Sequence, residues 1–253
     1  MEKYERIMEI GRGSYGVVWK AMNKQTGEVV AIKKLLEEYH AAEECMNLIE
    51  VKSLIKMANH PNIVKLKEVK RENNVARMKS FSETEIRNVC FQIFQGLAHM
   101  HKKDYFHRDL KPGNLLVSKN TVKIGDLGMA HKTNGKKPYT QNVTTLWYRA
   151  PEVFLRSSFY NFSVDMWAAG AIMAELLTNQ PLFQGSSSEA DVMHKIYRVL
   201  STPTKSPWFS GLDLAENICY RFPDYPGVRF SELLPNASFD AVNLIATLNG
   251  HNA

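Results

Sequence analysis

An ordered set of short motifs constrains this chain more than any other feature of its sequence. His107–Asn114 reads HRDLKPGN, Asp126-Leu127-Gly128 follows twelve residues after Asn114, and Ala150-Pro151-Glu152 closes the set. The three motifs are very improbable in this order by chance, so they locate the chemistry of the chain.

Length and composition set the broad class. The chain has 253 residues, 44% of them hydrophobic and 23% charged, which suits one large domain or two small lobes around a shared cleft. Cys45, Cys90 and Cys219 are too few and too scattered for a disulfide framework or a zinc site. The N-terminus lacks the apolar segment of a signal peptide, and the longest apolar stretch, Met166 to Leu177, is too short to span a bilayer. We therefore expect a soluble protein of the cytoplasm or nucleus, without a membrane partner.

The formal net charge of +6 could favour phosphorylated or acidic partners. The chain has no run of five or more like charges, however, so a solvated, lysine-rich surface is the simpler interpretation. Charge alone gives no support to nucleic-acid binding.

The first part of the chain, up to about residue 75, has the pattern of short strands with one helix. The cluster NKQTG at 23–27 predicts a turn, and a helical period of apolar residues predicts a helix over 42–57. Runs rich in β-branched residues predict strands at 4–10, 17–22, 28–36 and 63–69.

The second part is mainly helical. Ser82 and Glu85 form a capping box, which predicts a helix from Ser82 to about His101. A second helix is expected over 164–177, buried in the core because its middle is apolar on all sides. A last amphipathic helix is expected to begin near Asp240.

A glycine-rich segment, Gly11-Arg12-Gly13-Ser14-Tyr15-Gly16, matches G-x-G-x-x-G, which by itself is a weak signal. A dinucleotide-binding fold needs these glycines to open a helix, but the β-favouring run Val17 to Ala21 follows them. The glycines therefore cap a hairpin, where small residues let backbone amides approach phosphate. A purely structural hairpin is the alternative for this motif taken alone.

The next expected strand carries Val30-Ala31-Ile32-Lys33. Strand alternation puts Lys33 and Lys34 on opposite faces, so only one can enter a cleft, and we assign Lys33. Glu50 lies at the edge of the apolar stripe of the expected helix, where it can point inward and hold Lys33 towards phosphate oxygens. Glu43, two turns earlier on the same stripe, is the weaker alternative.

The glycine loop, Lys33 and the ordered motifs together resemble those of eukaryotic protein kinases. The resemblance covers nearly the whole chain and implies an α+β, bilobal kinase fold, with a small β-rich N-lobe at 1–75 and a larger helical C-lobe at 82–253. It also implies ATP and Mg²⁺ as cofactors. The residues that would bind ATP by this resemblance are Ile10, Gly11, Gly13, Gly16, Val18, Ala31, Lys33 and Glu50.

The resemblance also implies roles for the acidic and amide side chains. Phosphoryl transfer needs an aligned hydroxyl and neutralised phosphate charge more than covalent help. Asp109 would accept the proton of the substrate hydroxyl, and Lys111, a lysine found in Ser/Thr rather than Tyr kinases, would balance charge on the transferred group. Asn114, counted with these catalytic residues, would hold Mg²⁺ together with Asp126. Asp165 would anchor the backbone of the catalytic loop.

Within the kinases, the resemblance is closest to the CMGC group. The segments GSYGVVWKA at 13–21 and TLWYRAPE at 145–152 look like cyclin-dependent kinases. Phe106–Asp109 looks more like the male-germ-cell-associated kinase branch, which includes plant members. By this resemblance Thr145 and Arg149 border the pocket for the residue after the phosphoacceptor, which implies protein substrates with Ser/Thr-Pro sites.

Regulatory positions follow from the same resemblance. Ser14 and Tyr15 resemble inhibitory phosphorylation sites, and Thr140 resembles the activating site, which implies an upstream activating kinase. Cyclin dependence stays open, because the helix around Ile49 lacks the cyclin-contact sequence of its relatives.

Several positions depart from the family pattern. Leu127 replaces the usual Phe and keeps an apolar plug, whereas Gly113 replaces the usual Glu and is expected to loosen the catalytic loop by ~0.5–1 kcal/mol. Three arginines grip the activating phosphate in relatives; here only Arg108 matches, and Ile49 and His131 occupy the other positions. A phosphate gripped by one arginine orders a loop less well, so we expect weak activation by phosphorylation.

Two segments are shorter than the family pattern requires. Only about ten residues, 72–81, stand where the family has a fifth strand, the interlobe hinge and a helix. The chain ends at NLIATLNGHNA, before the terminal helices and the arginine that would pair with Glu152. We expect the first shortening to remove the main source of nucleotide specificity, because the hinge backbone binds adenine in the family. We expect the second to weaken the fold, because an unpaired buried carboxylate costs several kcal/mol.

Three interpretations of function follow. An active Ser/Thr protein kinase is favoured by the presence of every catalytic side chain. A weak or inactive pseudokinase that serves as a binding module is favoured by the shortened hinge. A truncated product of a kinase gene would explain why the motifs persist while the segments between them are lost.

Overall fold

The computed structural model describes residues 3–13, 16–35, 48–58, 60–67, 82–118, 121–133, 146–158, 160–185, 188–203 and 209–249. The chain divides into two compact units. One is drawn from Met1–Asn59 and Lys65–Lys79, and the other from His60–Val64 and Ser80–Ala253. The short segment 60–64, expected with the first part of the chain, belongs to the second unit.

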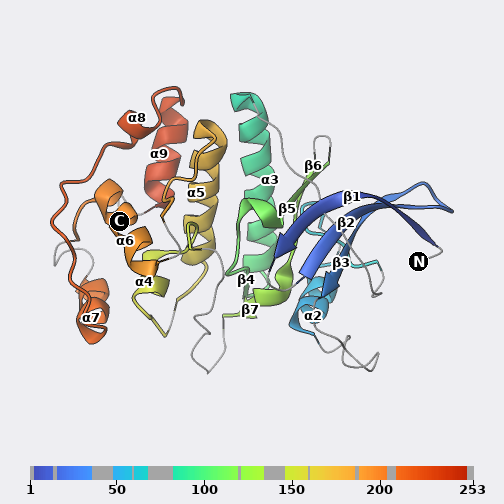
Figure 1. Ribbon diagram of the computed structural model, residues 1–253, viewed down its shortest axis with the longest axis horizontal. Helices are drawn as coiled ribbons and strands as arrows, with labels where there is room; N and C mark the ends of the chain where they lie inside the picture. The colour runs from blue at the N-terminus through green and yellow to red at the C-terminus, as the bar shows by residue number, and fades with distance from the viewer. Residues whose placement is uncertain are drawn as a thin grey trace. The chain divides into compact units, whose positions relative to one another are not determined.

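The first unit holds an antiparallel sheet of β1 (Tyr4–Gly13), β2 (Gly16–Asn23) and β3 (Val29–Leu35), in that order (Figure 1). Gly13 pairs with Gly16, so the glycine-rich motif lies at the tip of the β1–β2 hairpin. The motif therefore opens a strand and not a helix, as the sequence predicts. In the β2–β3 turn Gly27 has a φ of 69°, a conformation that favours glycine.

Helix α2 (Ile49–Lys56) completes the described part of this unit. It confirms the end of the helix expected over 42–57, whereas residues 42–47 lie outside the described part of the chain. Val51, Ser53 and Leu54 are buried, which leaves Glu50 at the edge of the buried face.

The strand predicted over 63–69 is wrong where it can be checked. Ile63 forms only an isolated bridge with Ile124, and the described residues 64–67 are not in a strand. The amide of Ile124 donates to the carbonyl of Asn62 at 2.8 Å, and the amide of Val64 donates to the carbonyl of Ile124 at 3.0 Å. These bonds tie the segment to the second unit, so its β-branched residues pack there without building a strand.

The second unit is built around α3 (Glu83–His101), α5 (Ser163–Thr178) and α9 (Phe239–Leu248), which lie side by side (Figure 1). The capping box that begins α3 is confirmed: the amide of Ser82 donates to Glu85 Oε2 at 2.7 Å. As expected, α5 is buried on nearly all sides in its middle. The α+β class is therefore confirmed, with a strand-rich first unit and a helical second unit.

Shorter elements connect these helices and carry the motifs. β4 (Tyr105–Phe106) pairs with β7 (His131–Lys132), and β5 (Leu115–Ser118) pairs with β6 (Thr121–Ile124). Two short 3₁₀ helices lie within the motif segments, at Pro112–Asn114 and Leu127–Met129. The remaining helices are α4 (Pro151–Phe154), α6 (Glu189–Leu200), α7 (Phe209–Asn217) and α8 (Phe230–Leu233).

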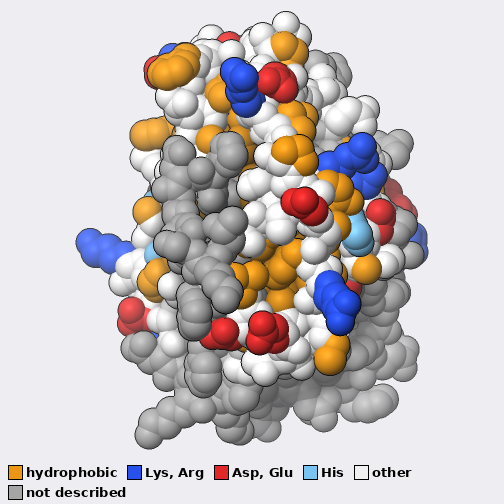
Figure 2. Space-filling model, turned by 90° about the vertical axis from the view of Figure 1, so that its left-hand side faces the viewer, with side chains coloured by type: hydrophobic (Ala, Val, Ile, Leu, Met, Phe, Trp, Pro, Cys, Tyr) orange, Lys and Arg blue, Asp and Glu red, His pale blue; other side chains and the backbone are white. Residues whose placement is uncertain are grey.

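The described surface is mixed in character. On the face shown in Figure 2, basic and acidic side chains are interspersed around a central group of apolar ones. Of the described helices, none is both long and apolar enough to cross a membrane. Cys90 and Cys219 are free thiols, one buried and one exposed, and Cys45 lies outside the described residues.

Candidate active site

Asp165, in the first turn of α5, binds the backbone of the segment His107–Asn114, called the catalytic segment below. This side chain is buried, and its Oδ1 accepts from the amide of Arg108 at 2.9 Å. Its Oδ2 accepts from the amide of His107 at 2.7 Å and contacts Nε2 of His101 at 2.9 Å. The chain turns sharply here, because Arg108 has a φ of 71°. The expected anchoring role of Asp165 is thus what the geometry displays.

His107 links the catalytic segment to the strand end that carries Asp126. Its Nδ1 accepts from the amide of Asp109 at 3.3 Å, so the hydrogen resides on Nε2, which lies 2.9 Å from the carbonyl of Gly125. The amide of Gly125 in turn donates to the carbonyl of Asn114 at 2.8 Å. These bonds hold the two motifs beside each other.

Asp109, Lys111 and Asn114 meet at one point. Lys111 Nζ lies 2.7 Å from Asp109 Oδ2. Asn114 Nδ2 donates to the carbonyl of Asp109 at 2.6 Å and also contacts Oδ2 at 3.3 Å. Asp109 is buried, with 8% of its surface exposed, so its carboxylate is held in one orientation by a cation and an amide.

The residues expected to hold Mg²⁺ have the donor chemistry that the ion requires. Because Nδ2 of Asn114 is used to hold Asp109, its carbonyl oxygen Oδ1 is the group left to serve as a hard ligand. Asp126 follows Gly125 directly, and its backbone is left-handed with a φ of 54°. Leu127 is completely buried, which confirms that it keeps an apolar plug. Asn114 and Asp126 therefore fit a magnesium site.

In the first unit Lys33 and Glu50 form the expected ion pair. Lys33 Nζ lies 3.1 and 3.0 Å from the two carboxylate oxygens of Glu50. Glu43, the alternative partner, lies outside the described residues. The other residues expected to bind ATP lie on the same three strands: Ile10, Gly11, Gly13, Gly16, Val18 and Ala31.

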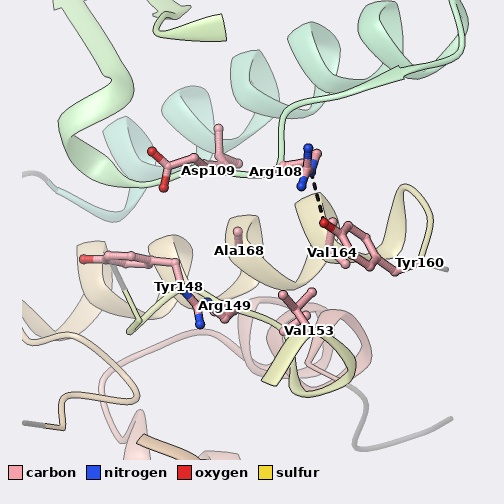
Figure 3. A pocket seen from close by; sticks show the side chains of 10 residues that line it. Arg108, Asp109, Tyr148, Arg149, Val153, Tyr160, Val164 and Ala168 are labelled. Carbon is pink, nitrogen blue, oxygen red and sulfur yellow. Dashed lines mark hydrogen bonds between the residues drawn. The ribbon is translucent and has the colours of Figure 1, made fainter. Parts of the chain in front are cut away.

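A small pocket lies beside the segment His107–Asn114 in the second unit. In Figure 3 Arg108 and Asp109 form one wall, and Tyr148, Arg149 and Val153 form the opposite wall. Its wall thus contains the proposed base and one of the residues expected to border the substrate pocket. Thr145, the other one, lies outside the described residues, as do Ser14, Tyr15 and Thr140.

Arg108 faces this cavity and is already engaged. Its Nε donates to the hydroxyl of Tyr160 at 3.0 Å (Figure 3), and its Nη1 lies 3.5 Å from the carbonyl of Met129. His131 and Ile49 stand at the two positions where the family pattern has further arginines. His131 Nδ1 lies 2.8 Å from the carbonyl of Lys132, and Ile49 is 58% exposed at the start of α2 in the first unit.

Glu152 is less isolated than the sequence suggests. Ser163 Oγ donates to its Oε1 at 3.3 Å. Burial raises the pKa of Glu152, and this hydrogen bond acts in the opposite direction. The carboxyl group is therefore pushed towards its neutral form, which lessens the penalty expected for an unpaired charge.

Three functional contacts escape prediction from the sequence: His101 with Asp165, Tyr160 with Arg108, and Glu189 with Arg149. The partners lie 64, 52 and 40 residues apart in the chain. The sequence gives only a weak indication that Glu189 has a partner, since it is an acidic residue in the first turn of a helix. A favourable interaction with the helix macrodipole explains an acidic residue at this position equally well.

Comparison with known proteins agrees with this geometry. A family model described as "Protein kinase domain" matches residues 4–245. The chain belongs to the protein kinase family. Its α+β fold is thus the bilobal kinase fold that the motifs predict.

Relatives of this kinase chain include plant and animal proteins of the expected group. It is 52% identical to "Cyclin-dependent kinase F-4" of Oryza sativa, over 98% of this chain and 57% of the relative. It is 45% identical to "Serine/threonine-protein kinase MAK" of Homo sapiens and 46% identical to "Serine/threonine-protein kinase ICK" of Mus musculus, over 98% of this chain and 42% of each relative. The chain thus spans about half the length of these relatives. The resemblance to the CMGC group is confirmed.

The alignment with the rice relative also bears on the shortened segments. It runs over 265 residues, which exceeds the 253 residues of the chain. The relative therefore has residues inside the matched region that have no counterpart here. This agrees with the expectation that internal connections are shorter than the family pattern, and residues 72–81, where the shortening is expected, lie outside the described residues.

Proposed function

We propose that this chain is an ATP-dependent serine/threonine protein kinase that transfers the γ-phosphate of ATP to Ser or Thr hydroxyls of protein substrates. The observation that carries the proposal is the arrangement of Asp109, with Lys111 Nζ at 2.7 Å and the amide of Asn114 bonded to its carbonyl at 2.6 Å. A complete catalytic set in a protein of this family favours transfer over binding alone.

The roles of these side chains follow from their contacts. Asp109 orients the substrate hydroxyl and accepts its proton. Lys111 lies close enough to the same carboxylate to place its positive charge against the phosphoryl group. Mg²⁺, held by Asn114 and Asp126, would neutralise charge on the phosphates when it is bound. Lys33, fixed by Glu50, provides a further cation for phosphate oxygens in the first unit.

Substrates with proline after the phosphoacceptor are part of the proposal. The support is that Arg149 and Asp109 line one cavity, so the residue that follows a hydroxyl bound at Asp109 lies within reach of the Arg149 wall. Phosphorylation of Thr140 by an upstream kinase would regulate the activity, with Ser14 and Tyr15 as inhibitory sites. A cyclin is a further candidate partner, since relatives carry the name cyclin-dependent kinase.

Transfer of phosphate from labelled ATP to a basic peptide with a single Ser-Pro site tests the proposal. We expect Mg²⁺-dependent labelling that Asp109→Asn abolishes and that Asp213→Asn, a change of the same kind in α7, leaves intact. Binding of Mg-ATP without transfer would contradict the proposal and favour a binding module. A chain that neither binds nor transfers would contradict any nucleotide-dependent role.

A further inference from the structure

Arg149 is a buried cation that shares an ion pair with a carboxylate on α6. Only 4% of its side chain is exposed, and burial lowers the pKa of Arg149 while Glu189 acts in the opposite direction. Its Nη1 lies 2.6 Å from Glu189 Oε1, and its guanidinium lies 5.1 Å from the centre of the Phe154 ring. A buried charge without a counter-charge is strongly disfavoured. Asp109 also attracts Arg149, but Glu189 is the carboxylate that is hydrogen-bonded to the guanidinium and so favours this orientation of it.

Glu189 uses its second oxygen as well. Its Oε2 accepts from Arg156 Nη2 at 2.6 Å. Arg149 precedes α4 and Arg156 follows it, whereas Glu189 is the first residue of α6. One carboxylate thus bridges both ends of α4 through two charge-assisted hydrogen bonds, which are the strong and directional kind.

The segment that carries Arg149 is fixed by its neighbours too. Trp147 Nε1 donates to the carbonyl of Gly185 at 2.9 Å, and the hydroxyl of Tyr148 donates to Glu175 Oε2 at 2.5 Å. Three consecutive side chains therefore anchor this segment to three different parts of the helical unit. Glu189 supplies the ion pair among these ties, and it acts on a residue that lines the cavity beside Asp109 (Figure 3).

We propose that Glu189 is a positioning residue for substrate selection: it holds Arg149 in the orientation that distinguishes the residue following the phosphoacceptor. The proposal rests on the proposed function, because it concerns the peptide site of that reaction. Glu189 itself touches neither ATP nor the reacting hydroxyl. It acts through Arg149, with Arg156 keeping its carboxylate in place.

A purely structural bridge would behave differently. If Glu189 only joined α4 to α6, its loss would lower stability and would weaken all substrates alike. A positioning role instead changes the ratio between substrates, since a displaced Arg149 alters the wall next to one side chain of the peptide. The ratio of two peptides therefore separates the roles.

The experiment uses the full chain and two fluorescent peptides that differ only in having Pro or Ala after a single Ser. Dissociation constants are measured by anisotropy and kcat/KM by phosphate transfer, at a temperature where circular dichroism shows every variant folded. For Glu189→Gln we expect the Pro/Ala preference to fall by about tenfold, since a displaced positioning group costs one to two orders of magnitude. The matched control is Glu232→Gln, which removes an exposed glutamate paired with Arg229 and makes the same change of charge.

The possible outcomes test the inference and the proposed function separately. An unchanged ratio in Glu189→Gln, an equal loss for both peptides, or the same fall in the control overturns the inference. If the wild type binds the peptides but transfers no phosphate, the proposed function fails, while the ratio of dissociation constants still tests Glu189. If the wild type binds neither peptide, the inference is overturned, because no peptide selectivity exists for Glu189 to set.

Discussion

Two glycines of the helical unit have opposite surroundings. A Cβ added to Gly113 would meet no atom within 4 Å, whereas one added to Gly170 would lie 2.6 Å from Asn249 Oδ1. We expect Gly113→Ala to raise the free energy of unfolding by about 0.4–1 kcal/mol, because the unfolded chain loses freedom without a clash in the folded one. We expect Gly170→Ala to lower it by about 1–3 kcal/mol through overpacking.

Urea unfolding of both variants measures this difference. It also tests the interpretation that Gly113 loosens the catalytic loop, since a side chain is tolerated there in the folded state. A destabilised Gly113→Ala would show that the backbone at this position depends on glycine.

Glu152 gives a prediction about pH. Burial raises its pKa in the folded protein, so its charged form costs stability above that pKa, and the cost disappears as the pH falls and the carboxyl group is protonated. We therefore expect Glu152→Gln to be more stable than the wild type at neutral pH, with a difference that shrinks towards acid pH. Chemical unfolding between pH 5 and pH 8 measures it.

Glu85 is the control for this titration, because its pKa is shifted in the opposite direction and its ionisation therefore has the opposite effect on stability. Hydrogen bonds from Ser82 lower the pKa of Glu85, so its charged form adds stability above its unfolded pKa and loses it as the pH falls. Glu85→Gln should thus be less stable than the wild type at neutral pH. A Glu152→Gln variant that behaves like Glu85→Gln would contradict the burial argument.

At the scale of elements, α5 acts as the support of the catalytic segment. Asp165 accepts from two backbone amides and contacts His101. Asp165→Asn keeps the shape but places an amide against donors, so we expect a loss of about 2–4 kcal/mol of stability. Hydrogen exchange should show faster exchange of the amides of His107 and Arg108, and unchanged exchange there would contradict the supporting role.

Elements whose signals are local were predictable. The capping box at Ser82 began α3 as expected, and the β-favouring run after Gly16 gave β2. The strand expected from Ile63 failed because Asn62 and Val64 bond to the backbone of Ile124, sixty or so positions away. The propensity of a β-branched run was overridden by a partner that a local pattern cannot reveal.

The residues of the candidate site can also be divided into those with a local sequence signal and those without one. Asp109, Lys111, Asn114 and Asp126 were predictable because their motifs are short and ordered along the chain. The bridge from Glu189 was not, because it joins residues from two elements 40 and 33 positions apart. Short motifs thus indicate the candidate catalytic residues, whereas contacts between residues far apart in the chain become apparent only in the tertiary structure.

For the whole molecule, two sources of positive charge could attract a nucleoside triphosphate: the net charge of +6 and the Lys33 ammonium held by Glu50. Binding to the folded state alone stabilises it by about 2.7 kcal/mol at a hundredfold excess over Kd. We therefore expect Mg-ATP to raise the thermal midpoint of the wild type. Lys33→Met should remove most of this shift, since it removes the cation that Glu50 holds in place.

The control is Lys24→Met, a change of the same kind at an exposed lysine in the β2–β3 turn. It should leave the shift intact, which separates a specific phosphate contact from a general effect of positive charge. Because a general effect weakens steeply with added salt, the shift of the wild type should also persist at higher ionic strength. Equal losses in both variants would mean that the ATP is held by net charge and not by the Lys33–Glu50 pair.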